Sequence, residues 1–154
     1  KIGENEGVVV AGGNGCGNDL NQLNQPHFIY VDQEDTLYVS DLGNHRVMKW
    51  TKGVKEGIIV AGGQGPGISL KQLNSPQGIF VDKLGTLYVA EASNDRIVRW
   101  IKDAKEGSII AGGNSRGTKP NQLNVPIGLL FDDENNLYIV DKDNHRIQKF
   151  VVNN

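Results

Sequence analysis

The sequence contains only one cysteine, Cys16, among its 154 residues. A single thiol cannot form a disulfide within the chain, and it lacks the further cysteines that a cysteine-based zinc site requires. We therefore interpret Cys16 as an ordinary loop residue. An intermolecular disulfide or a reactive thiol is the alternative interpretation.

Long apolar segments are also absent from the sequence. No segment approaches the roughly 20 consecutive apolar residues that cross a bilayer as a helix, and no basic stretch followed by an apolar one marks a secretory signal. No window shows a sustained apolar period of 3.6 residues, so we expect little or no helix. The sequence predicts no membrane partner.

An excess of charge of either sign is missing as well. The chain has 16 Lys and Arg against 18 Asp and Glu, which gives a net charge of −2 and a pI near 5.9. Nucleic-acid-binding domains usually carry a basic stripe, whereas here basic and acidic residues are mixed, as in Lys52, Lys55 and Glu56. We predict no nucleic-acid partner.

Glycine, in contrast, is plentiful, and it marks an internal repeat. The 20 glycines suit a turn-rich β protein. Ala11-Gly12-Gly13 recurs 50 residues later and again after a further 50, with no insertion or deletion between the copies. Because a fixed period of this length is typical of repeat architectures, we predict one domain, residues 1–154, with repeats at 7–56, 57–106 and 107–154.

Each repeat is predicted to contain four short strands. Their residues are rich in β-branched and aromatic types, and they are often apolar on both faces. Sheets that are covered on both sides by other sheets require such a pattern. In the second repeat the predicted strands are residues 78–82, 86–90, 96–100 and 107–111.

The repeat resembles the NHL repeat family. The residues that carry the resemblance in the third copy are Pro126-Ile127-Gly128-Leu129, Leu137-Tyr138-Ile139-Val140-Asp141 and Asn144-His145-Arg146-Ile147. The chain departs from the family pattern at Phe28, where Gly is expected, at Glu91 (Asp expected) and at Asp95 (His expected). The resemblance implies a β-propeller of four-stranded blades, typically six, but it implies no single activity, because the family includes protein-binding, RNA-binding and catalytic members.

The order of the strands predicts a homodimer. Residues 7–11 match the fourth, outermost strand of a repeat, whereas the chain ends after a third strand. Three blades cannot close a ring, since propellers use about 4 to 8, and an open half ring would expose two apolar faces. We predict an all-β propeller with three four-stranded blades per chain, in which two chains form a six-bladed ring and each N-terminal strand completes the partner's last blade. A fragment of a longer propeller and a β-trefoil are the alternatives.

Residues that recur in every repeat are interpreted as architecture. The recurring Arg is expected to pair with Asp41, Glu91 or Asp141, and the aromatic residue at the end of the third strand is expected to pack between blades. His45, Asp95 and His145 share one position, which we interpret as a loop position that faces solvent or makes a capping bond. The recurring set is Asn44, Arg46, Asn94, Arg96, Asn144, Arg146, Trp50, Trp100 and Phe150.

Residues that vary between the repeats are the candidate ligand site. One position follows the repeated Pro and opens the innermost strand, near the mouth of the central channel, and the others lie in the loop before the repeated Asn. A constant frame with variable loops is typical of a recognition surface. We therefore predict a non-catalytic scaffold for protein or peptide ligands, with His27, Gln77, Ile127, Leu42, Ser93, Lys142 and Asp143 as contacts.

No catalytic residue, metal or cofactor is predicted. The sequence shows no Ser-His-Asp or Cys-His arrangement, and the Gly-rich runs at 12–15 and 62–67 are not followed by the helix of a phosphate-binding loop. Residues 132–136 are interpreted as an exposed turn rather than a calcium site. The alternative functions are a metal-dependent lyase or hydrolase of the NHL-related type, using His27 and Tyr30, and a purely structural or designed repeat.

Overall fold

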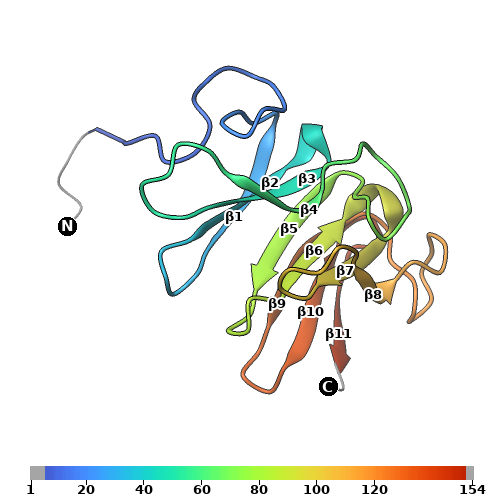
Figure 1. The fold of residues 1–154 in the computed structure, drawn as a ribbon. Coiled ribbons are helices and arrows are strands. Elements are labelled where there is room, and N and C mark those ends of the chain that lie inside the picture. Colours follow the sequence, from blue (N-terminus) through green and yellow to red (C-terminus); the bar gives the residue numbers. More distant parts are fainter. Residues whose placement is uncertain (1–5, 152–154) are drawn as a thin grey trace.

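The computed structural model describes residues 6–151 of the chain. Within them lie eleven β-strands and three short 3-10 turns, arranged as three antiparallel sheets (Figure 1). We call the sheets blades 1 to 3. Blade 1 contains β1 (Pro26–Val31), β2 (Leu37–Asp41), β3 (Arg46–Trp50) and β4 (Ile58–Gly62); blade 2 contains β5 (Pro76–Val81), β6 (Leu87–Glu91), β7 (Arg96–Trp100) and β8 (Ser108–Gly112); blade 3 contains β9 (Pro126–Phe131), β10 (Asn136–Asp141) and β11 (Arg146–Val151).

The prediction of an all-β chain with little helix is confirmed. The described residues contain no α-helix, and the 3-10 turns η1 (Leu42–Asn44), η2 (Ala92–Asn94) and η3 (Lys142–Asn144) have three residues each. Within a blade the strands follow one another as neighbours, and the first strand of blade 2, β5, contacts both β1 and β9. The blades therefore fan out from their first strands, which is the arrangement of a β-propeller and not that of a β-trefoil.

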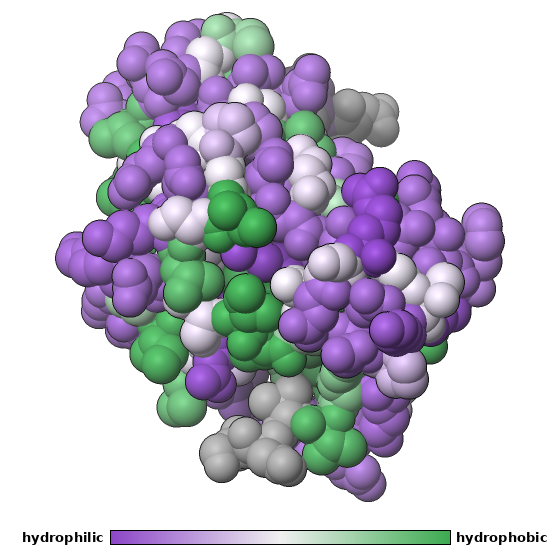
Figure 2. Space-filling view, turned by 90° about the vertical axis from the view of Figure 1, so that its right-hand side faces the viewer, coloured by the Kyte–Doolittle hydropathy of each residue, from purple (hydrophilic) through white to green (hydrophobic). Residues whose placement is uncertain are grey.

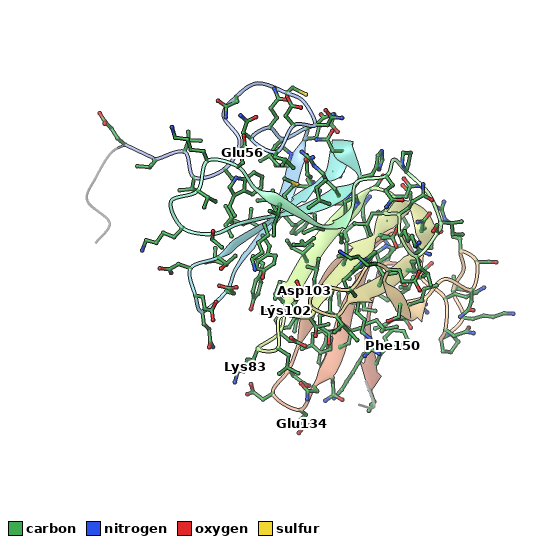
Figure 3. All side chains as sticks on the ribbon, in the orientation of Figure 1. Glu56, Lys83, Lys102, Asp103, Glu134 and Phe150 are labelled. Atoms are coloured by element: carbon green, nitrogen blue, oxygen red, sulfur yellow. The ribbon has the colours of Figure 1, made fainter. Side chains whose placement is uncertain are left out.

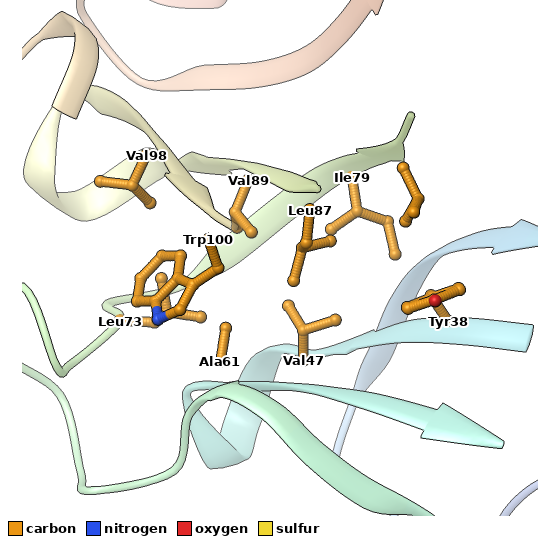
Figure 4. Packing of buried hydrophobic residues seen from close by; sticks show 10 residues of the cluster. Tyr38, Val47, Ala61, Leu73, Ile79, Leu87, Val89, Val98 and Trp100 are labelled. Atoms are coloured by element: carbon orange, nitrogen blue, oxygen red, sulfur yellow. The ribbon is translucent and has the colours of Figure 1, made fainter. Parts of the chain in front are cut away.

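The hydrophobic core lies between the blades. In Figure 4, Val47 and Tyr38 of blade 1 face Leu87 and Val89 of blade 2. We call the face of a blade that is turned toward the preceding blade its entry face, and the opposite one its exit face. The entry face of blade 2 includes Ile79, Val81, Leu87, Val89, Val98 and Trp100, and its exit face includes Ala90, Ile97 and Ala111, which pack against Leu137 and Ile139 of blade 3.

The predicted packing role of the repeated aromatic residue is confirmed. Trp50 and Trp100 are 2% and 3% exposed, and Phe150 packs against the cluster between blades 2 and 3. The rings need room beside them: a Cβ atom at Gly57 or Gly107 would lie within about 3 Å of the Trp50 or Trp100 ring. In blades 1 and 2, the aromatic residue that ends the third strand therefore requires a glycine just before the fourth strand.

Blade 3 has three strands, whereas blades 1 and 2 have four. Residues 7–10, which the sequence analysis expected to be a strand, form no strand within this chain, and Val8, Val9 and Val10 are exposed. The physical reason is that a strand needs the hydrogen-bonding edge of a neighbour. The fourth strands β4 and β8 each pair with the third strand of the same blade. Residues 7–10 would need the third strand of a blade that precedes blade 1, and residues 6–151 contain no such blade.

Candidate functional site

One end of the blades gathers the residues that vary between repeats. The strand register places Pro26 opposite Asp41, Pro76 opposite Glu91 and Pro126 opposite Asp141. The start of each first strand therefore lies beside the 3-10 turn that follows the second strand. Lys83 and Glu134, labelled in Figure 3, lie in the turns between the first and second strands, at the opposite end of their blades. We call the end with the 3-10 turns the loop face.

The loop face is built on a repeated cluster of a carboxylate, an Asn and an Arg. In blade 1, Asp41 Oδ2 accepts hydrogen bonds from Arg46 Nε and Asn44 Nδ2, both at 2.7 Å, while Asp41 Oδ1 accepts one from the Asn24 amide at 2.7 Å. The guanidinium also donates to the carbonyl of Asn18 at 2.6 Å. The cluster therefore ties the long loop that enters a blade to the turn that leaves its second strand.

Blades 2 and 3 contain the same cluster. Glu91 binds Arg96, Asn94 and the Asn74 amide, and Asp141 binds Arg146 Nε at 2.8 Å. The predicted pairing of the repeated Arg with Asp41, Glu91 and Asp141 is confirmed. Because all three carboxylates are completely buried and each is held by several donors, they are structural groups and not free acids or bases.

The surroundings of these carboxylates differ in their effect on the pKa. Burial raises the pKa of the Glu91 carboxyl, although hydrogen bonds from Arg96 and Asn94 act in the opposite direction. Burial acts on Asp141 in the same sense, but bonds from Asn144, the Asn124 amide and Arg146 outweigh it, so that the pKa of Asp141 lies below its usual value. The Arg of blade 3 is also more exposed than that of blade 2.

The position shared by His45, Asp95 and His145 links neighbouring blades. The Ser75 amide of blade 2 donates to His45 Nδ1 at 3.1 Å, and the Val125 amide of blade 3 donates to Asp95 Oδ1 at 2.8 Å. The interpretation as a capping position is thus confirmed for two copies, and the structure adds that the bond crosses from one blade to the next. His45, Asp95 and His145 all have left-handed backbone conformations, with φ between 50° and 53°.

Along the first strands, the predicted ligand residues differ in exposure. His27 is exposed, and its ring packs edge-on against Phe28 with the centroids 5.0 Å apart. Gln77 and Ile127, at the same position in blades 2 and 3, are half-buried, and Gln77 Oε1 has no hydrogen-bond partner in the described part of the chain. Blade 1 therefore presents this position most openly.

The other predicted ligand residues lie in the 3-10 turns. Leu42 is half-buried, whereas Ser93, Lys142 and Asp143 are exposed. Ser93 Oγ donates to Ser75 Oγ at 2.9 Å, and Lys142 Nζ lies 3.4 Å from Asp143 Oδ1. The seven predicted residues share the loop face, but in residues 6–151 only Lys142 and Asp143 are joined to each other by a hydrogen bond or ion pair.

Sequence reasoning missed Phe28 as a candidate contact. Ser40 Oγ accepts a hydrogen bond from the Phe28 amide at 2.8 Å and donates one to the Phe28 carbonyl at 3.3 Å. The corresponding Gly78 has no room for a side chain, since a Cβ atom there would lie 2.8 Å from Gly128 Cα. The sequence contained a signal for this difference. The first repeat has Phe28 where the other two have Gly78 and Gly128, and it has Ser40 where they have Ala90 and Val140.

Two of the features considered for a metal or catalytic site make structural contacts. Within residues 6–151 no group of three or more His, Cys, Asp and Glu side chains is placed to hold a metal ion. Tyr30, paired with His27 in the lyase alternative, packs against Phe80 of blade 2 with the ring centroids 5.4 Å apart. Residues 132–136 form a turn in which Asp132 Oδ1 accepts from the backbone amides of Glu134 and Asn136. The described residues contain no helix long and apolar enough to span a membrane.

Comparison with protein families agrees with this geometry. Residues 23–50 and 123–150 match the family described as NHL repeat. The first and third repeats are thus similar to the NHL repeat. Each match runs from the entry loop to the end of the third strand and so includes the carboxylate–Asn–Arg cluster of blade 1 or blade 3. A search of the curated proteins found no match.

Solved structures show the same fold. An auxiliary nutrient binding protein from Bacteroides ovatus has a TM-score of 0.64 at 20% identity, over 86% of this chain and 38% of that one. A structure of the nidogen/laminin complex gives 0.63 at 24% identity, over 83% and 44%. The virginiamycin B lyase from Staphylococcus aureus gives 0.53 at 15%, over 83% and 41%. The chain thus spans less than half the length of each of these structures.

Proposed function

We propose that the chain is a non-catalytic binding scaffold that pairs with a second copy of itself to form a six-bladed ring and uses the loop face to bind protein or peptide ligands. The proposed assembly rests on one observation. The two outermost faces of the chain, the entry face of blade 1 and the exit face of blade 3, repeat the entry and exit faces that pack against each other between its blades. The exit face of blade 3 and the entry face of blade 1 therefore match each other as the faces of adjoining blades within the chain do.

The entry face of blade 1 is open. Ile29 is 68% exposed, whereas Ile79, at the same position in blade 2, is 7% exposed because blade 1 covers it. The segment before β1 covers part of this face, since Ala11 and Leu23 pack against Val39, Met48 and Trp50. Ala61 and Leu73 lie in the equivalent cluster between blades 1 and 2. Ala11 thus already occupies the place that the fourth strand of a preceding blade would take.

The exit face of blade 3 is open as well. Ile147 is 63% exposed, whereas Ile97 is completely buried against blade 3. Figure 2 shows apolar side chains gathered in the middle and lower part of one side of the molecule. Exposed apolar residues of blade 3 are Leu130, Val140, Ile147 and Val151. An apolar face of this kind is typical of a protein interface.

The strand register supports the same pairing. Arg46 lies opposite Gly62 and Val47 opposite Ala61, and blade 2 repeats this pairing with Arg96 and Gly112. The equivalent pairing for β11 joins Arg146 to Gly12 of a second copy and Ile147 to its Ala11. The edge of β11 and residues 7–12 are both without a neighbouring strand in the described chain, so one exchange at each of two junctions completes two four-stranded blades.

The assembly is tested by measuring absolute mass with light scattering at several concentrations. The chain mass is 16.8 kDa, and we expect a species of twice that mass. A compact monomer at every concentration, or a larger open-ended series of oligomers, would contradict a closed pair of half rings. A monomer would instead point to a chain that needs further blades of a longer propeller.

Ligand binding is tested by panning a random-peptide display library on the immobilised protein. One variant replaces His27, Lys142 and Asp143 by Ala on the loop face, and the matched control replaces Lys83 and Glu134 by Ala at the opposite end. We expect selected peptides to lose binding to the first variant and to keep it with the control. A library that yields no specific peptide, or peptides that bind the first variant unchanged, would contradict the proposal.

A further inference from the structure

Each pair of adjoining blades is joined by one bond between a side chain and a backbone amide. The acceptor is His45 Nδ1 between blades 1 and 2, and Asp95 Oδ1 between blades 2 and 3; the donors are the amides of Ser75 and Val125. An imidazole and a carboxylate have in common only that each offers an acceptor at this place. The shared feature is therefore an acceptor for the amide at the entrance to the next blade, and we call this bond the latch.

Half of a third latch lies at each end of the chain. His145 has φ 53° and Gln25 has φ 53°, and these values match those of His45 and Ser75 at 51° and 52°. In residues 6–151, no hydrogen bond involves the His145 ring or the Gln25 amide. Both are at the surface. The acceptor and the donor thus have the backbone conformations of the other two latches, and residues 6–151 of one chain do not join them.

We propose that His145 of one copy accepts a hydrogen bond from the Gln25 amide of the other, so that two such latches close the ring. This inference rests on the proposed assembly and names the residue that fixes its register. Gln25 shares its left-handed conformation with Ser75 and Val125, whose amides donate to the blade before them, so we expect the Gln25 amide to donate in the same way to a blade that precedes blade 1.

The junction between two copies differs from the one between blades 2 and 3 in a second contact. Arg116 Nε lies 3.0 Å from Asp95 Oδ2 and adds an ion pair beside the latch. The residue equivalent to Arg116 in the first repeat is Cys16, and the equivalent of Asp95 in the third is His145. The loops correspond in structure, because Cys16 and Pro66 make the same parallel bridge to Leu23 and Leu73. The junction between copies therefore holds the latch without the ion pair.

This difference defines a double-mutant cycle. His145→Asp keeps an acceptor, Cys16→Arg supplies the guanidinium, and the double variant recreates the Asp95–Arg116 pair at both junctions. His145→Ala removes the acceptor, and His45→Ala, which removes the latch inside the chain, is the matched control. The dissociation constant of the dimer is measured for each variant by dilution, with sedimentation or light scattering as the readout.

We expect His145→Ala to raise the dissociation constant by about fivefold per junction, and so by about 30-fold for a ring with two junctions, since a lost hydrogen bond of this kind costs about 1 kcal/mol. His145→Asp stays within a few-fold of the original chain, and His45→Ala changes the stability of the chain far more than its dimerisation. The dissociation constant of the double variant should be several-fold lower than the value expected if the effects of the two single changes simply added. The gain is limited to several-fold because a partly exposed ion pair contributes little free energy.

Three results distinguish the possibilities. A chain that stays monomeric at every concentration contradicts both the assembly and the latch. A dimer whose dissociation constant is unchanged by His145→Ala, with no coupling between the changes at residues 16 and 145, contradicts the latch and leaves the assembly in place. A dimer that weakens with His145→Ala, tolerates His145→Asp and shows coupling in the double variant supports the latch.

Discussion

Replacing Ile147 by Ala provides a test in which the chain supplies its own reference. Ile147 and Ile97 occupy the same position in consecutive repeats, on the exit faces of blades 3 and 2. Ile97 is completely buried, and Ile147 is 63% exposed in the single chain. Truncating a buried Ile to Ala costs about 2–5 kcal/mol in free energy of unfolding, so Ile97→Ala sets the scale for a covered exit face.

The expected cost of Ile147→Ala depends on what covers blade 3. A single chain keeps only about a third of the Ile147 side chain out of water, and burying a complete Ile side chain contributes about 1.5–3 kcal/mol, so the truncation would cost less than about 1 kcal/mol. In the closed ring the same change removes packing against the entry face of a second blade 1. It should then approach the cost of Ile97→Ala for each chain.

The assay is urea unfolding of the original chain and both variants, followed by tryptophan fluorescence from Trp50 and Trp100. It is run at two protein concentrations, because the unfolding of a dimer depends on concentration and that of a monomer does not. The reasoning is refuted if the protein is a dimer by mass and Ile147→Ala costs less than about 0.5 kcal/mol per chain. That result would place the exit face of blade 3 outside the interface.

Three further predictions concern the repeated cluster and metal binding. Arg96→Ala should destabilise the chain by about 3–5 kcal/mol, because it leaves Glu91 buried without its ion partner; Arg146→Ala should cost less in the monomer, where Arg146 is 30% exposed, and urea unfolding measures both. The pKa of Asp141 is below its usual value in the folded chain, so its contribution to stability is complete above pH of about 4 and is lost as the pH falls below that. The unfolding free energies of Asp141→Asn and of the original chain should therefore lie closer together at pH 3 than at pH 7. A larger gap at pH 3 than at pH 7 would contradict this sign. Dialysis against EDTA should leave the melting temperature unchanged, whereas stoichiometric zinc or calcium in the dialysed protein would favour the lyase or hydrolase alternative.

Much of the fold is determined by local features of the sequence. The glycines, the β-branched strands and the repeat of 50 residues predicted four strands per repeat, because turn chemistry and side-chain alternation act over a few residues. The pairing of Arg46 with Asp41 and the burial of Trp100 followed from recurrence, since a residue kept at the same place in every repeat meets the same neighbours. The gathering of His27, Ser93 and Lys142 at one end followed from the order of strands in a blade.

Other properties depend on neighbours that are distant in sequence. The bond from the Ser75 amide to His45 spans 30 residues, and only the placement of one blade beside the next brings its two groups together. The difference in burial between Ile97 and Ile147 has the same origin: identical residues at identical positions differ because one faces a blade and the other does not. Sequence alone determines what each blade is, whereas the tertiary structure decides which faces, edges and amides of those blades are covered by another blade of the described chain.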